Sequence, residues 1–300
     1  MPLPKHLKRL LRRPANGGTP RNDISFDTFV LVMFSKEKLK ELLKLKTKKG
    51  REAQRRFLIE GVRLCEEIAN SNWETESVLF TSSFQNSSTG KKLLQKFERR
   101  NTKIVSVKSE VIKKLSDTVT PQGIICVVKI REFSLDQLWS EDSNIILALD
   151  AIRDPGNVGT LIRTADAFGI GGVILSADTV ELYNPKVVRS TMGSIFHLPI
   201  FDEIDLEKTI PQLKKRNFKI YGTDVKEGKD LDKLDYSTRI CLLIGNEAEG
   251  LNKNLFELSD EIIRIPIFGR AESLNASVAG GILLYEITKR KRQKFNTANQ

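Results

Sequence analysis

The segment Ile262–Ile287 brings together residue types that can bind a ligand. A β-type apolar run leads into the polar loop Gly269–Ser273, and a helix rich in small residues follows. If Ser273, Asn275 and Ser277 lie in the first turn of that helix, they offer hydroxyl and amide groups beside backbone N–H groups that have no intrahelical partner. From these residues alone two interpretations stay open, a capped and buried terminal helix or a ligand site.

Two further polar loops follow apolar, strand-like runs. The first contains Asn157 and Arg163, and Pro155-Gly156 predicts a turn there, with Asn157 capping the next helix. The second runs from Gly245 to Gly250 and contains Glu247. Because ligands of open α/β sheets bind at the carboxyl ends of the strands, the three loops are expected to meet at one edge of a sheet.

Several kinds of chemistry are disfavoured by what the 300 residues lack. The chain has only two histidines, and a zinc site or a Ser-His-Asp triad would depend on His197, which is expected to be a packed structural residue in the apolar run Ile195–Pro199. Three cysteines without a CxxC pair indicate a reducing compartment. No apolar run approaches the roughly 20 residues of a membrane span. The loop before Asn157 has no GxGxxG, which disfavours a nucleotide-dependent oxidoreductase.

The net charge of +11 is concentrated at the N-terminus, where residues 1–56 hold 16 Lys and Arg against 5 Asp and Glu. A basic region on a neutral body is typical of a protein that binds a polyanion, and RNA or DNA is favoured over a merely solvated tail. Residues 1–32 admit three interpretations: a mitochondrial-type targeting segment, a basic arm, or sequence upstream of a true start at Met33.

The helices and strands that must position these loops are expected to form two α/β domains. In residues 35–130 the pattern predicts a basic helix over Ser35–Lys49 and further helices and strands. The strands expected there are Phe57–Gly61, Ser77–Thr81, Lys103–Val107 and Gly123–Lys129, and the helices are Val62–Ala69, Thr89–Arg100 and Ser109–Leu115. The polar stretch 131–144 is expected to be a linker.

Beyond residue 144 strands and helices alternate, which together with continuous apolar strands predicts a parallel sheet covered on both faces. The expected strands are Ile145–Asp150, Gly172–Ser176, His197–Phe201, Phe218–Thr223, Ile240–Gly245 and Ile262–Phe268. The expected helices are Val158–Phe168, Pro185–Ser194, Leu206–Lys215 and Leu274–Lys289. Gly280-Gly281 is expected to allow close packing of the last helix.

The three loops together resemble the SpoU (TrmH-type) family of RNA ribose 2′-O-methyltransferases, within the SPOUT superfamily. The motifs that carry the resemblance are NVGTLIR at 157–163, IGNEAEGL at 244–251 and IPIFGRAESLNASVA at 265–279. Residues 35–130 are similar, more weakly, to the small L30e-like RNA-binding domain that precedes the catalytic domain in many members. The implied organisation is an arm (1–34), an L30e-like domain (35–130), a linker (131–144), a catalytic domain (145–292) and a tail (293–300).

The resemblance implies an α/β catalytic domain with a deep trefoil knot, S-adenosylmethionine as methyl donor, no metal, and a homodimer that completes the active site. Carried over by motif position, the donor would contact Gly245, Ile265 and Leu274, with Thr223 as a weaker candidate. The catalytic residues implied are Arg163, Asn157, Glu247, Ser273 and Asn275. Arg163 is either a general base or, since arginine normally stays protonated, an electrostatic stabiliser.

The implied activity is transfer of a methyl group to a ribose 2′-hydroxyl, with ribosomal RNA favoured as substrate. The alternatives are the same chemistry on tRNA and a non-catalytic RNA-binding protein that keeps the fold. Lys44, Lys46, Lys48 and Lys49 are expected to contribute to RNA binding. The expected compartment is the cytoplasm, or the mitochondrion if residues 1–32 are a targeting segment, and no membrane association is expected.

Overall fold

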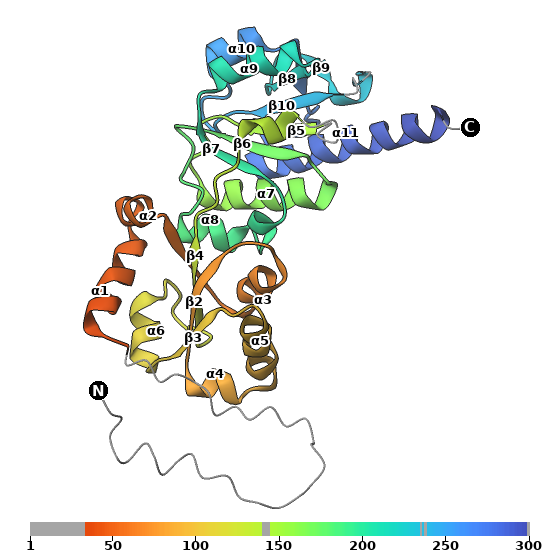
Figure 1. Cartoon of the computed structure of the whole chain (residues 1–300). Helices are drawn as coiled ribbons and strands as arrows, with labels where there is room; N and C mark the ends of the chain where they lie inside the picture. The colour runs from red at the N-terminus through yellow and green to blue at the C-terminus, as the bar shows by residue number, and fades with distance from the viewer. Residues whose placement is uncertain (1–33, 140–144, 235, 237–238, 299–300) are drawn as a thin grey trace, which may run out of the picture. The chain divides into compact units, whose positions relative to one another are not determined.

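The computed structural model describes residues 34–139, 145–234, 236 and 239–298 (Figure 1). The described residues belong to one compact unit. The arm expected over residues 1–34, with its three interpretations, lies outside the described residues except for Phe34. Within the described residues, no helix is long and apolar enough to cross a membrane.

The first domain contains a four-stranded mixed sheet with the order β1-β4-β2-β3. Strand β4 pairs antiparallel with both β1 and β2, and β2 pairs parallel with β3. The strands are β1 (Arg56–Glu60), β2 (Thr75–Phe80), β3 (Lys103–Ser106) and β4 (Ile124–Lys129). All four expected strands of this domain therefore exist, with ends shifted by no more than two residues.

The basic helix expected over Ser35–Lys49 is wrong as a single element. It is divided into α1 (Lys36–Leu43), the 3₁₀ turn η3 (Lys44–Lys46) and α2 (Lys48–Gln54). The break falls at Thr47, which has extended backbone angles and whose hydroxyl accepts a hydrogen bond from Gly50 N at 3.2 Å. A threonine at this position caps a new helix because its side chain competes with the helical hydrogen bonds.

The other helices of this domain are α3 (Val62–Asn70), α4 (Ser82–Asn86), α5 (Ser88–Arg99) and α6 (Ser109–Leu115). The short helix α4 was not expected, and Thr81 caps it. The 3₁₀ helix η4 (Leu135–Trp139) lies inside the stretch expected to be a linker, and its Leu138 is fully buried against the second domain's core. Part of the expected linker therefore packs against the second domain and does more than connect the two domains.

The second domain contains a seven-stranded sheet with the order β7-β6-β5-β10-β8-β11-β9, in which every pair is parallel. The strands are β5 (Ile145–Leu149), β6 (Gly172–Ser176), β7 (Ile200–Ile204), β8 (Lys219–Thr223), β9 (Lys229–Asp230), β10 (Ile240–Ile244) and β11 (Glu261–Arg264). Every residue of β5, β6 and β10 is buried, which confirms the expected parallel sheet with both faces covered.

Helices cover the two faces of this sheet, with α9 (Leu206–Lys215) and α10 (Lys253–Leu258) on one face and α7 (Pro155–Phe168) and α11 (Ala276–Ala298) on the other (Figure 1). Helix α11 packs closely on α7 at Gly280. A Cβ there would lie 2.3 Å from Leu161 Cδ2 and 2.7 Å from Ile244 Cδ1, so any larger residue would displace these side chains, and the expected close packing is confirmed at this position. Gly281 is less constrained, since its nearest neighbour would be 3.9 Å away.

Some expected bounds in the second domain are wrong. Residues Ser194–Phe196 form the 3₁₀ turn η5, so α8 (Pro185–Ser190) ends early and β7 begins at Ile200 rather than His197. Strand β11 ends at Arg264, and Ile265 and Ile267 after it line a pocket instead of extending the sheet. Helix α10, the short strand β9 and the 3₁₀ turn η6 (Leu231–Lys233) were not expected.

Candidate active site at the strand ends

Helix α7 begins directly after β5, and its first turn fixes the position of Asn157. The N-cap is Asp154, whose carboxylate accepts a 2.8 Å hydrogen bond from Asn157 N, and Pro155 is the first helical residue. The expectation that Asn157 caps this helix is therefore wrong, as is the expected Pro155-Gly156 turn. Proline suits the first helical position because its missing N–H has no partner to lose there. The Asn157 side chain is thus left free for other bonds.

That side chain joins the three polar loops. Asn157 Nδ2 donates to Glu247 Oε1 at 2.6 Å, and Asn157 Oδ1 accepts from Asn275 Nδ2 at 3.0 Å. The loops after β5 and β10 and the segment before α11 are therefore linked by a single Glu247–Asn157–Asn275 chain. Asn157 is only 9% exposed, so both bonds lie in a partly desolvated position where they are stronger than in water.

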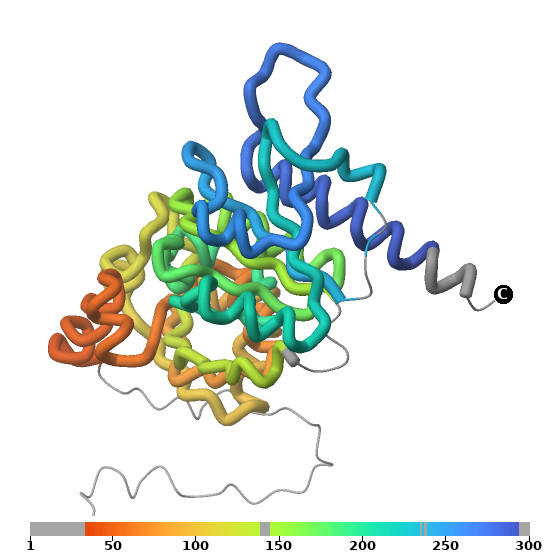
Figure 2. The backbone as a smooth tube through the Cα atoms, turned by 90° about the horizontal axis from the view of Figure 1, so that it is seen from above, coloured from red at the N-terminus to blue at the C-terminus, as the bar shows by residue number. Residues whose placement is uncertain are grey.

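The bounds expected for the last helix, Leu274–Lys289, are wrong at both ends, because α11 begins two residues later and continues to Ala298, into the expected tail 293–300. The helix begins at Ala276, and Asn275 Oδ1 accepts bonds from Ser277 N at 3.0 Å and Val278 N at 3.3 Å. These N–H groups are therefore occupied by the Asn275 cap and are not available to a ligand. Ser273 precedes the helix in an exposed loop rather than lying in its first turn, and Figure 2 shows the blue segment between β11 and α11 projecting as a loop.

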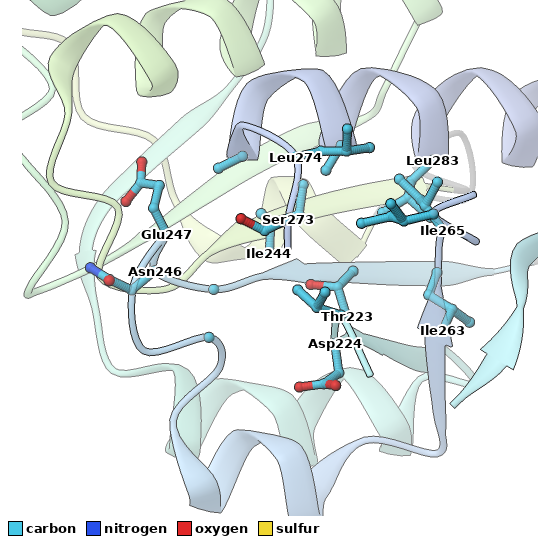
Figure 3. A pocket seen from close by; sticks show the side chains of 16 residues that line it. Thr223, Asp224, Ile244, Asn246, Glu247, Ile263, Ile265, Ser273, Leu274 and Leu283 are labelled. Carbon is cyan, nitrogen blue, oxygen red and sulfur yellow. The ribbon is translucent and has the colours of Figure 1, made fainter. Parts of the chain in front are cut away.

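A pocket opens beside the Glu247–Asn157–Asn275 chain, at the carboxyl ends of β8, β10 and β11 (Figure 3). The four residues expected to contact the methyl donor all line it: Thr223, Gly245, Ile265 and Leu274. Glu247 and Ser273 line it too, whereas Asn157, Arg163 and Asn275 do not. Most of the remaining wall is apolar, with Ile263, Ile267 and Leu283 among its residues.

A glycine and a threonine hydroxyl determine the shape of this pocket and the groups that it offers. At Gly245 a Cβ would lie 2.3 Å from the carbonyl carbon of Gly250, so the loop that the two glycines bound closes only without a side chain there. Thr223 Oγ1 donates to Leu243 O at 2.9 Å, so its proton is used within the sheet. A ligand could therefore use the Thr223 side chain only through its oxygen lone pairs or its methyl group.

Arg163 lies on the exposed side of α7. The helical period places its neighbours Leu161 and Ile162 in the core, both with no exposed surface, which explains the apolar residues around a charged one. Within the described part of the chain, the Arg163 side chain makes no hydrogen bond or ion pair. Of the five expected catalytic residues, the structure thus joins three by hydrogen bonds, places Ser273 on the pocket wall and leaves the Arg163 guanidinium free.

Two supporting residues were not found from the sequence. Asn246 Nδ2 donates to Ala151 O at 2.8 Å, and its Oδ1 accepts from Ala248 N at 2.8 Å, so it ties the β10 loop to the β5 loop. Asp150 Oδ2 accepts from Asn252 N at 3.0 Å, and burial raises the pKa of the Asp150 carboxyl. Asn246 stands directly before Glu247, and an Asx residue opening a polar loop is a recognisable turn signal.

His197 does not lie among apolar side chains as expected. Its side chain is 41% exposed, with Nδ1 2.8 Å from Asp166 Oδ2 and Nε2 3.4 Å from Glu67 Oε2. Its role is still structural, since it links α7 to α3. The part of the chain that the structure describes contains no group of three or more His, Cys, Asp or Glu side chains that could hold a metal ion.

A parallel α/β domain with a mostly apolar pocket at its strand ends, preceded by a small mixed-sheet domain, defines a two-domain protein that can bind a ligand at the edge of its second sheet. Comparison with known proteins shows which activity this arrangement has. Residues 144–285 match the model of the SpoU rRNA Methylase family, and residues 36–126 match that of the MRM3-like substrate binding domain. The chain belongs to the SpoU rRNA methylase family.

Individual relatives support this membership. The chain is 34% identical over 251 residues to the 23S rRNA (guanosine(2553)-2′-O)-methyltransferase RlmP of Bacillus subtilis, covering 84% of this chain and 96% of the relative. The structure matches the SpoU methyltransferase AviRb from Streptomyces viridochromogenes in complex with AdoMet, with a TM-score of 0.76, 26% identity and coverage of 86% and 98% of the two chains. An AdoMet-bound rRNA methyltransferase from Sinorhizobium meliloti matches with a TM-score of 0.75 and 31% identity over 84% and 94%.

The expected class of enzyme, an S-adenosylmethionine-dependent RNA ribose 2′-O-methyltransferase, is thereby confirmed. The residues of the pocket fit the donor. Its apolar wall suits an adenine ring, and its carboxylates suit a ligand that carries a sulfonium and an ammonium group. The individual roles of the site residues and the domain bounds remain predictions.

Proposed function

We propose that this protein methylates a ribose 2′-hydroxyl of ribosomal RNA. The observation that carries the proposal is the Glu247–Asn157–Asn275 chain, which stands beside a pocket lined by the four residues expected to hold the donor. The relative in Bacillus subtilis, which is named for a 23S rRNA guanosine, supports ribosomal RNA over tRNA. When bound, S-adenosylmethionine supplies an electrophilic methyl group, and the protein must align the hydroxyl and stabilise its loss of a proton.

Arg163 is proposed to stabilise the developing negative charge at the 2′-oxygen and to orient the adjacent phosphate. Its guanidinium has no partner within the described residues, so it can bind an incoming anion without breaking an existing bond. Arginine stays protonated in proteins, which favours this role over that of general base. Asn157, held between Glu247 and Asn275, is proposed to fix the loops against which the ribose is placed. Ser273 is proposed to contact the substrate from the pocket wall.

The small domain is proposed to bind RNA through lysines on α1, η3 and α6, consistent with the expected L30e-like fold. The exposed lysines there that make no ion pair within the described residues are Lys36, Lys40, Lys44, Lys113 and Lys114. Two of the four lysines expected to bind RNA are less suited. Lys46 Nζ lies 2.9 Å from Asp117 Oδ1, and Lys48 Nζ lies 2.7 Å from Glu203 Oε1. Part of the positive charge of both lysines is therefore already compensated.

Homodimerisation through α11 is proposed as well. Val278, Ile282 and Tyr285 are 51%, 39% and 53% exposed, and their spacing of four and three residues places them on one face of the helix. The pocket residue Leu274, which precedes the helix by two residues, is 37% exposed. A row of exposed apolar side chains that adjoins the active site fits a second copy of the chain that completes the site. A deep trefoil knot in residues 145–292, part of the expected fold, is also proposed.

Deletion of the gene, followed by mapping of 2′-O-methyl marks in total RNA, tests the substrate. One ribosomal mark is expected to disappear and to return when the purified full chain and S-adenosylmethionine are added to that RNA. Loss of a tRNA mark instead would move the substrate to tRNA, and an unchanged set of marks would favour the non-catalytic alternative. Whether residues 1–32 direct the chain to mitochondria or it stays in the cytoplasm is tested by locating full-length and truncated fusions.

A further inference from the structure

The donor pocket contains a carboxylate that the expected site residues do not account for. Asp224 directly follows Thr223 at the carboxyl end of β8 and lines the pocket, half-buried (Figure 3). Its Oδ1 accepts hydrogen bonds from Lys226 N and Glu227 N, both at 2.7 Å, which fixes the side chain in a tight turn. Its Oδ2 makes no hydrogen bond to any residue that the structure describes. One carboxylate oxygen is therefore held in place at the pocket wall and left without a donor.

The order of strands shows which part of a ligand this oxygen meets. In the strand order β5-β10-β8-β11, Asn157 and Glu247, which are proposed to organise the reacting end, belong to the loops after β5 and β10. Asp224 follows β8, one strand further from β5. The methyl group must face the substrate on the side of β5 and β10. The oxygen of Asp224 therefore meets a part of the donor that is remote from the reacting bond.

The residues around Asp224 indicate which part of the donor its free oxygen meets. Ile263 and Ile265, from β11 and the segment after it, lie next to β8 and give an apolar surface that suits the flat adenine ring. Adenine is attached directly to the ribose of the donor, whose two neighbouring hydroxyls are hydrogen-bond donors. A carboxylate oxygen with two lone pairs is matched to such a pair, and hydrogen bonds to charged groups are stronger than those between neutral groups.

We propose that Asp224 Oδ2 accepts hydrogen bonds from the ribose hydroxyls of S-adenosylmethionine and so selects a ribonucleoside donor. The inference rests on the proposed function and adds a binding residue to the same pocket. Asp224 holds the nucleoside end while Asn157 and Glu247 organise the reacting end. Asp224 is thus a specificity residue for the donor and takes no part in proton transfer.

Binding calorimetry with the full-length protein tests this, because it needs no RNA and no turnover. The ligands are S-adenosylhomocysteine, its 2′-deoxy and 3′-deoxy analogues, and an analogue that lacks the α-amino group. The proteins are the wild type, Asp224→Asn and Glu227→Gln. Asparagine can keep the oxygen that accepts from Lys226 N and Glu227 N, so the turn is preserved, while an N–H₂ group replaces Oδ2. Glu227 lies in the same turn but does not line the pocket, which makes it a matched control.

The wild type and Glu227→Gln are expected to lose about tenfold in affinity when either hydroxyl is removed from the ligand. Asp224→Asn is expected to bind S-adenosylhomocysteine about tenfold more weakly, and to lose less than about twofold on removal of a hydroxyl. If Asp224→Asn still distinguishes the deoxy analogues as well as the wild type does, the role of Asp224 is refuted. It is equally refuted if the variant loses discrimination only against the ligand without the amino group. A wild type that binds none of these ligands would overturn the donor pocket itself, and with it this inference.

Discussion

Asn157 donates a 2.6 Å hydrogen bond to Glu247, although 90 residues separate them in the chain. The bond connects the first turn of α7 to the loop after β10, and Asn275 extends the connection to the start of α11. The Asn157 side chain alone thus connects three segments that are distant in the sequence. The consequences can be tested at each of the features around it.

Asn157→Ala removes both side-chain bonds and leaves Glu247 and Asn275 without their partners. We expect kcat to fall by at least about tenfold because the loops lose their mutual alignment, while affinity for S-adenosylhomocysteine changes by less than about twofold. Single-turnover methylation and calorimetry separate the two effects. Asn254→Ala is a matched control, because Asn254 donates a similar amide bond to Glu207 at 3.0 Å away from the pocket. Equal losses in both variants would contradict the prediction.

Arg163→Ala should reduce methylation by about 10³-fold if the guanidinium stabilises the transition state, with donor binding unchanged. Arg163→Lys separates the two proposed roles. A stabilising lysine works only while protonated, so its rate should fall as pH approaches the lysine pKa of about 10.4, whereas a general base would become faster. Methylation rates of this variant from pH 7 to 10 decide between them. The exposed Lys215→Ala on α9 should retain full activity.

Substitution of Lys40, Lys44, Lys113 and Lys114 by alanine should weaken RNA binding and reduce its dependence on salt. Each lost phosphate contact lowers the slope of log K against log salt concentration by about 0.7 to 0.9. Filter binding at several salt concentrations measures this. The pair Lys46→Ala and Lys48→Ala should have a smaller effect, because both lysines already lie next to carboxylates. Donor affinity should stay constant in both sets, and an unchanged salt slope in the first would refute the RNA surface.

Ile282→Glu places a charge in the exposed apolar face of α11. We expect the variant to be monomeric in sedimentation velocity experiments at concentrations where the wild type is a dimer, and to lose methylation with it. Lys215→Glu, at an exposed position of α9 on the other face of the sheet, tests whether added negative charge alone is responsible. A wild type that is monomeric at all concentrations would rule out the dimer.

Asp202 gives the folded protein a specific dependence on pH. Burial raises the pKa of its carboxyl from 3.8 to about 6, although Leu182 N and Glu203 N both donate to it. The folded state therefore binds more protons than the unfolded state between these values, so this group makes stability fall as pH rises from about 4 to 6. Asp202→Asn should remove that fall and stabilise the protein at pH 7 by at most about 3 kcal/mol.

Urea unfolding at pH 4.5 and pH 7 measures the effect of Asp202. The gain from Asp202→Asn should be present at pH 7 and small at pH 4.5, and the exposed Asp178→Asn should show no such difference. A gain that is equal at both pH values would show that something other than the buried charge is responsible.

The sequence was most informative where local pattern and tertiary position agree. The unbroken apolar runs Ile145–Leu149 and Ile240–Ile244 predicted a buried parallel sheet because only strands covered on both faces have that pattern. The strand-end rule then placed the loop that contains Gly245 and Glu247 at the edge of the sheet, where the structure has it. Ile265 was expected inside a strand, and only the family resemblance assigned it to the pocket.

Helix starts and contacts between loops could not be predicted from the sequence, because several neighbouring side chains compete for the same role. Asp154, Pro155 and Asn157 are all reasonable near a helix start, and only the contact with Glu247, distant in sequence, decides that Asp154 caps the helix while Asn157 turns inward. The break at Thr47 is similar, since a threonine between lysines is compatible with one helix or two. Bonds such as that of Asn246 to Ala151 join separate loops and have no local signature.

The place of β10 in the sheet has a consequence for how the protein is made. β10 lies between β5 and β8, which do not pair with each other, so the two parts of the sheet have no continuous hydrogen bonding until residue 244 has left the ribosome. The wall that Ser273, Leu274 and Leu283 supply comes later still. Such non-local pairing folds slowly, since distant segments must meet before any bond forms. A nascent chain therefore has no methylating centre until synthesis is nearly complete, although it emerges beside the very class of RNA that its family modifies.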